Sequence, residues 1–189
     1  MNTQDPRKYY LYLQWPQYLA QWYANEQYRL EHCEDDVLSP YEYDCSLDPY
    51  DLEPVETQRG TIERIIMQQH LAKPYDREHI RPTEASICIR IPDFKASGKD
   101  TNIYNYLPPK AQNMLEDAVR NRLRLELYTY VTKVYHKNME SLTLESTLSA
   151  WMEQHGITNN DANYEAIKQL YRRCISNYLD YRRRIKRKE

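Results

Sequence analysis

Hydrophobic residues recur every fourth position along one long stretch of the chain, and this is its strongest structural pattern. Pro108 and Pro109 suit the first turn of a helix, and the pattern behind them predicts a helix over about 108–138. The residues expected to face the core are Ala111, Leu115, Val119, Leu123, Leu127, Val131 and Tyr135, broadened by Met114, Ala118 and Tyr128. This row is the clearest predicted core in the sequence.

Shorter patterns predict two strands and two further helices in the first half of the chain. YLYL near the start alternates between the two side-chain directions, as ICIRIP does later, and each indicates a strand. One helix is predicted over about 16–28, beginning at Pro16. A second follows Thr61, whose hydroxyl can cap TIERIIMQQHL. The residues of this second helix expected to face inward are Ile62, Ile65, Ile66 and Leu71.

The last 50 residues predict a pair of helices. Ser141 or Thr143 caps the first, LESTLSAWMEQH, and Gly156 falls where a left-handed helix end is expected. The buried face of this helix is predicted to be Leu144, Leu148, Trp151 and Met152. Asn160 or Asp161 caps the final helix. Its expected packing seam is heptad-like and consists of Tyr164, Ile167, Tyr171, Cys174, Tyr178, Tyr181 and Ile185.

These patterns together predict a mainly α-helical domain with a small two- or three-stranded sheet and a long acidic loop. The loop is expected at about 30–57, where acidic residues and three prolines replace any helical period. Residues 1–140 are interpreted as a core region of helices and strands that carries this insert. Residues 141–189 are interpreted as a helical hairpin, or a helix-turn-helix-like pair, with a basic C-terminus.

The net charge of −2 hides a strong asymmetry between the two ends. Residues 1–60 contain twelve acidic and four basic side chains, whereas residues 161–189 contain nine basic and four acidic ones. Such a separation is typical of an acidic arm and a basic contact region. No apolar run is long enough for a membrane span, and the first residues lack the pattern of a signal peptide, so a cytoplasmic location without membrane contact is expected.

The basic residues of the final helix are the candidate contacts to nucleic acid. They lie off the predicted seam or beyond its end and are Lys168, Arg172, Arg173, Arg182, Arg183, Arg184, Lys186, Arg187 and Lys188. Phosphate neutralisation supplies much of the affinity for nucleic acid, and the planar guanidinium group matches phosphate oxygens. Two other interpretations remain open, because a basic helix end is also typical of a solvated tail or of a surface that binds an acidic protein.

The last two predicted helices also resemble a helix-turn-helix motif. In that motif the first residues of the second helix face the edges of the bases. The corresponding residues here are Asn163, Tyr164, Lys168 and Arg172. The turn, GITNN, is about one residue longer than usual, and a plain helical hairpin fits the pattern equally well.

Signatures of catalysis and of bound cofactors are weak. Three glycines are too few for the usual phosphate-binding loops, and neither a metalloprotease nor a hydrolase motif occurs. Asp93 and Lys95, which follow the second strand, match the end of some metal-dependent nuclease motifs. Such a site needs a further acidic ligand, for which Asp76, Glu78 and Glu84 are candidates. The alternative interpretation is a polar turn after a strand. The four cysteines form no CxxC pair. The group His32, Cys33 and Cys45 is at most half a metal site, so no metal or cofactor is expected.

Several segments resemble small uncharacterised proteins of phages and mobile elements in gut bacteria. The resemblance lies in LAQWY, RGTIER, IPDFK with NYLP, and AWMEQHGI followed by NYEAIKQLYRR. It implies a role in genome maintenance, regulation or counter-defence and supplies no catalytic residues.

The sequence therefore predicts a non-enzymatic DNA-binding protein, regulatory or accessory, from a phage or mobile element, with double-stranded DNA as its partner. The alternative is a protein-interaction factor, such as a virion component or a counter-defence protein. In this alternative the acidic, tyrosine-rich segment carries the contact. Neither the oligomeric state nor the identity of a protein partner follows from the residues.

Overall fold

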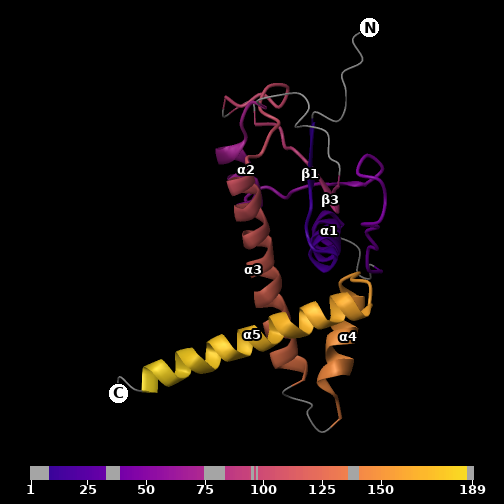
Figure 1. Cartoon of the computed structure of the whole chain (residues 1–189), viewed down its shortest axis with the longest axis vertical. Coiled ribbons are helices and arrows are strands. Elements are labelled where there is room, and N and C mark those ends of the chain that lie inside the picture. Colours follow the sequence, from indigo (N-terminus) through magenta and orange to yellow (C-terminus); the bar gives the residue numbers. More distant parts are fainter. Residues whose placement is uncertain are drawn as a thin grey trace.

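The protein is mainly helical, with one small sheet of three strands in the described part of the chain (Figure 1). The computed structural model describes residues 9–32, 39–74, 84–94, 96, 98–135 and 141–186, with the side chains of 179–186 excepted. The helices are α1 (Gln17–Glu31), α2 (Ile62–His70), α3 (Pro109–Val134), α4 (Leu144–Gln154) and α5 (Asp161–Lys186). The strands are β1 (Tyr10–Leu13), β2 (Pro54–Val55) and β3 (Ile87–Arg90). This confirms the predicted fold class.

β3 is the central strand of the sheet. It pairs antiparallel with β1, with Tyr12 opposite Cys88, and parallel with β2, with Val55 opposite Ile89. Ile87 and Ile89 share one face of the strand and are fully buried. Cys88 points to the other face and is also buried. Both faces of β3 are therefore covered. This keeps the apolar side chains on both faces of the central strand out of water.

α3 is the helix around which the others pack. Its predicted row of buried residues is confirmed from Ala111 to Val131, whereas Tyr135 at the end of the row is half-buried. Met114, expected to broaden this row, is instead 39% exposed. The helix contacts α1, α2, α4 and α5, and Figure 1 shows α5 crossing it and extending past it. One hydrophobic cluster runs from Leu11 in β1 to Tyr171 in α5 and so joins both regions of the chain.

The inward face of α2 differs from the prediction at two of the four predicted residues. Thr61 does cap the helix, because its hydroxyl accepts a hydrogen bond from the Arg64 backbone N–H. Ile62 and Ile65, however, are 50% and 41% exposed. Ile66 and Leu71 are buried as predicted, and Glu63 and Met67 are buried in place of Ile62 and Ile65. The spacing of apolar residues does not determine which of two adjacent faces of a short helix is buried. In α2 the buried face contains Glu63, which forms an ion pair with Arg122.

The structure does not confirm a long free loop at about 30–57. Helix α1 continues to Glu31 and β2 begins at Pro54. Between them, residues 39–53 follow an irregular path but pack on the core through Tyr43 and Leu52, both nearly fully buried. The Tyr43 hydroxyl accepts a hydrogen bond from the Cys88 N–H at 3.1 Å. We call residues 39–53 the acidic segment; it covers part of the sheet.

The α4–α5 connection follows the sequence closely. Thr143 caps α4 in a reciprocal capping box with Ser146, and Gly156 has a φ of 62°, the left-handed conformation expected at this helix end. Leu148, Trp151 and Met152 are fully buried, as predicted. Among the helices of the described residues, none combines the length and the apolar composition that crossing a lipid bilayer requires.

Candidate functional site

The first candidate site is the outer face of α5. The Asn160 side-chain oxygen caps this helix by accepting the Asn163 N–H at 2.8 Å. Ile167, Leu170 and Tyr171 are buried against the rest of the molecule. The side chains on the opposite face therefore point to solvent, because helical residues three and four apart share one face.

The predicted contact residues fall into three groups. Arg172 and Arg173 are exposed, and neither has an ion-pair partner among the described side chains. Lys168 is half-buried, lies 2.7 Å from a Glu165 carboxylate oxygen and sits above the Tyr164 ring. The other predicted residues lie at the end of the chain. Arg182, Arg183, Arg184 and Lys186 belong to α5 but their side chains are outside the description, and Arg187 and Lys188 lie outside the described residues.

Arg124 of α3 joins this basic face, and the sequence did not identify it. Burial raises the pKa of the Tyr18 hydroxyl, while nearby arginines, Arg124 and Arg173 among them, lower it. Burial also raises the pKa of the Cys174 thiol, and the charge of Arg124 opposes this shift. Arg124 therefore lies beside α5, where it lines a hollow together with Cys174 and Tyr178. Only the crossing of two helices far apart in the sequence brings it there.

The geometry of a groove-reading helix-turn-helix is not present at the start of α5. Asn163, one of the residues expected to face base edges, is 3% exposed. Its amide nitrogen donates to the Thr158 carbonyl oxygen at 2.9 Å, so the side chain fastens the turn. Tyr164 is partly buried against the core. The prediction that Asn163 faces bases is therefore wrong, whereas Tyr164 is half-buried and Arg172 is exposed.

The nuclease motif gains no support from the described residues. Asp93 is exposed at a hollow that Arg59, Arg64 and Arg90 also line. Asp93 belongs to no group of three potential metal ligands within the described part of the chain. Lys95, Asp76 and Glu78 lie outside it, and the carboxylate of Glu84 accepts a hydrogen bond from the Gln14 amide.

The described residues also give no support to a metal site at His32, Cys33 and Cys45. His32 Nδ1 lies 2.9 Å from the Tyr28 carbonyl oxygen, and Cys33 lies outside the described residues. Burial raises the pKa of Cys45 and of Cys88 to about 12. Both groups therefore remain thiols at neutral pH, and a thiol is a poorer ligand than a thiolate.

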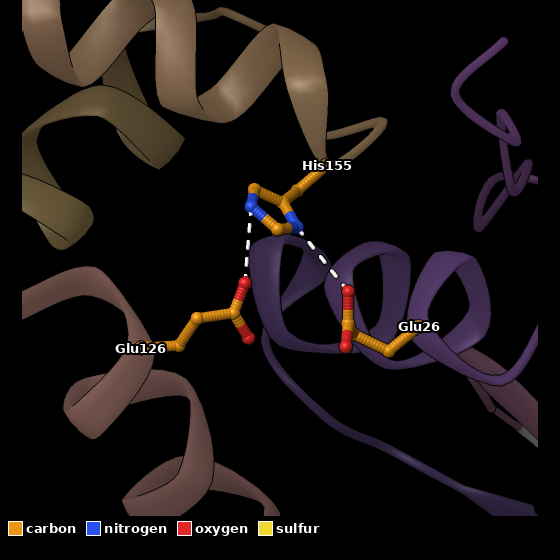
Figure 2. A group of neighbouring side chains, drawn as sticks. All are labelled: Glu26, Glu126 and His155. Carbon is orange, nitrogen blue, oxygen red and sulfur yellow. Dashed lines mark ion pairs between the residues drawn. The ribbon is translucent and has the colours of Figure 1, made fainter. Parts of the chain in front are cut away.

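A second candidate site lies where α1, α3 and the end of α4 meet. Figure 2 shows the imidazole of His155 between the carboxylates of Glu26 and Glu126. His155 Nδ1 is 3.4 Å from Glu26 Oε1, and Nε2 is 3.1 Å from Glu126 Oε1. The residue is 3% exposed, and the Trp151 ring packs on its imidazole. Nothing in the sequence pattern marks this site, because its three residues come from three distant segments.

The electrostatics of the two carboxylates differ. Burial raises the pKa of Glu126, and the charge of Glu26 adds to the shift. Burial also acts to raise the pKa of Glu26, but the neighbouring His155 and the charge of Arg29 outweigh it and lower this pKa. Glu26 is thus the carboxylate that holds its charge more firmly.

A buried ion pair lies beside this cluster. Glu63 of α2, fully buried, contacts Arg122 of α3 at 3.1 Å. The Arg122 guanidinium also stacks above the rings of Trp22 and Tyr23 in α1. Arg122 thus ties α1, α2 and α3 together. The Tyr23 hydroxyl and the second oxygen of Glu63 are buried without a hydrogen-bond partner.

Comparisons with known proteins give no relative. No protein-family model matches the chain, and no curated protein or solved structure matches it significantly.

Proposed function

We propose that the protein is a non-enzymatic DNA-binding protein that contacts the phosphate backbone through the outer face of α5. The observation that carries the proposal is the exposure of Arg172 and Arg173 on the face of α5 that turns away from the core. Their side chains have no acidic partner among the described residues, so their charges are available to phosphate. A regulatory or accessory role in a phage or mobile element is part of the proposal and rests on the sequence resemblance.

The length of α5 suits a contact along a duplex. With a rise of about 1.5 Å per residue, the helix from Arg172 to Lys186 spans about 21 Å. This length matches roughly six base pairs of B-DNA at about 3.4 Å each. Figure 1 shows this part of α5 extending past α3. A helix that protrudes from the body can approach a duplex without steric conflict from the other helices.

The buried position of Asn163 favours contacts to phosphate over reading of bases. Phosphate contacts position a protein on DNA without selecting a sequence. We therefore expect similar affinity for unrelated duplexes. Lys168 is already paired with Glu165, so its contribution is expected to be small.

The test is a titration of fluorescein-labelled 20-base-pair duplexes of two sequences, followed by anisotropy from about 50 to 200 mM salt. The log–log slope of affinity against salt is expected to be about −0.9 per phosphate contact. Removing residues 182–189 should weaken both duplexes alike and flatten the slope. Arg172→Ala with Arg173→Ala should reduce the slope by up to about two further units.

Two matched variants serve as controls. Arg59→Ala removes an exposed arginine from the turn before α2 and should leave the slope unchanged. Lys168→Ala should have little effect, in contrast to the expectation for a base-reading helix. A folded protein that shows no binding at about 50 mM salt would overturn the proposal.

The alternative function, a protein-interaction factor, is supported by a separate observation. Leu47 and Tyr50 of the acidic segment are 43% and 41% exposed. A groove between this segment and the α4–α5 turn is lined by Glu42, Asp44 and Glu153 without a described lysine or arginine. Such a surface suits a basic protein partner. A purified sample without the excess absorbance at 260 nm that nucleic acid gives, and that also fails the duplex titration, would favour this function.

A further inference from the structure

We propose that Glu26, Glu126 and His155 form a binding site for a divalent transition-metal ion, with Zn²⁺ as the best match to the donors. The site is independent of the basic face of α5. It combines one imidazole with two carboxylates that come from α1, α3 and the residue that ends α4. Imidazole and carboxylate are usual ligands of Zn²⁺, and sites with three protein ligands leave a position for water.

The first argument is a count of protons. A neutral imidazole carries one N–H, yet both ring nitrogens of His155 face a carboxylate oxygen. Nδ1 is buried and makes no hydrogen bond. The ring therefore needs either a second proton or a cation beside one nitrogen. A metal ion beside one nitrogen supplies the cation, and the other nitrogen keeps its N–H for the carboxylate oxygen that it faces. That carboxylate has a second oxygen with which to bind the ion.

The second argument is geometric. One donor atom from each residue can be chosen so that all three lie within 4.8 Å of one another. Bonds of about 2.0–2.2 Å to a common tetrahedral ion place donors roughly 3.3–3.6 Å apart. Small rotations of the two glutamate side chains close this difference. The backbones that carry them belong to helices, and the Trp151 ring restrains the imidazole, so the donors keep their relative positions.

The third argument concerns charge and access. Glu26 and Glu126 approach the same ring from two sides, and Arg29, 3.6 Å from Glu26, is the cation nearest to Glu26 on its own helix. Arg122 is engaged by Glu63. The Arg29 side chain is 43% exposed and can turn into solvent when a dication enters. The Glu126 side chain is 34% exposed, so an ion and a water ligand can reach the site from that side.

The experiment is calorimetric titration of the full, untagged chain with ZnCl₂ after dialysis against EDTA. One Zn²⁺ is expected to bind and to raise the thermal midpoint, since a ligand of the folded state stabilises it by mass action. Glu126→Gln and Glu26→Gln should each weaken binding at least tenfold, because an amide oxygen is a poorer ligand than a carboxylate. Co²⁺ bound in place of Zn²⁺ should show visible d–d absorption that Glu126→Gln reduces.

The control is Glu153→Gln, an exposed carboxylate two residues before His155, which should bind Zn²⁺ as the unchanged chain does. Circular dichroism verifies that each variant is folded. Zn²⁺ binding that persists in both glutamate variants would place the ion elsewhere and overturn the proposal. The absence of saturable binding would do so too.

Discussion

Residues that are close together in the sequence of α3 differ strongly in solvent exposure. Leu123 is fully buried, whereas Leu125 is 68% exposed. Two residues correspond to a rotation of about 200° around the helix, so these leucines point in nearly opposite directions. The same residue type thus stabilises the protein at one position and has little effect at the other.

Leu123→Ala is expected to lower the free energy of unfolding by about 2–4 kcal/mol, because the change removes buried methyl groups and leaves a cavity. Leu125→Ala is the matched control and should change it by less than about 0.5 kcal/mol. Urea denaturation of both variants measures the difference. Equal effects would show that the buried face of α3 has been assigned incorrectly.

Among the connections between elements, the turn that joins α4 to α5 is the most constrained. Gly156 has a positive φ, and a Cβ built there would lie 2.2 Å from the Tyr41 carbonyl oxygen. The acidic segment is therefore packed against this turn. Tyr41 is fixed from the other side as well, because its N–H donates to the Asn25 side chain of α1 at 2.8 Å. The turn thus connects three elements, and its glycine is needed both for backbone conformation and for space.

Gly156→Ala is expected to destabilise the protein by roughly 2–4 kcal/mol, the sum of left-handed backbone strain and the displacement of Tyr41. Gly60 has the same sign of φ, but a Cβ added there would have nothing within 4 Å, so Gly60→Ala isolates the backbone contribution and should cost only about 1 kcal/mol. Denaturation midpoints of the two variants give the comparison. A Gly156 variant no less stable than the Gly60 variant would contradict the close packing.

In the molecule as a whole, the two regions distinguished by sequence share one hydrophobic cluster. Trp22 of α1 and Trp151 of α4 are both fully buried within it. α3 belongs to the first region by sequence, yet it packs on α4 and α5 of the second. The acidic segment contributes Leu52 to the same cluster. Stability is therefore expected to belong to the whole chain rather than to separate parts.

Urea unfolding monitored by tryptophan fluorescence and by far-ultraviolet circular dichroism is expected to give coincident midpoints. Leu52→Ala should shift both by the same amount, corresponding to about 2–4 kcal/mol, because the acidic segment is an integral part of the core. Separate midpoints, or a Leu52 variant of unchanged stability, would indicate that the segment or the helical pair unfolds by itself.

The sequence by itself determined the features that depend on near neighbours. The buried row on α3, the caps at Thr61 and Thr143 and the left-handed Gly156 all follow from residues within about four positions, since helical hydrogen bonds and caps have that range. The exposed arginines of α5 followed from the same periodicity. For these features the structure has the conformation that the neighbouring residues in the sequence predict.

Only the tertiary structure decided which groups meet across the chain. Glu63 is buried and Ile62 is exposed because Arg122 of α3 lies opposite the glutamate and offers its charge. The Glu26–His155–Glu126 cluster joins residues 100 and 29 positions apart, and Arg124 reaches α5 through the crossing of two helices. Charges and ring nitrogens act through space over a few ångströms, whereas the sequence orders residues only along the chain. Their partners are therefore set by how the helices pack.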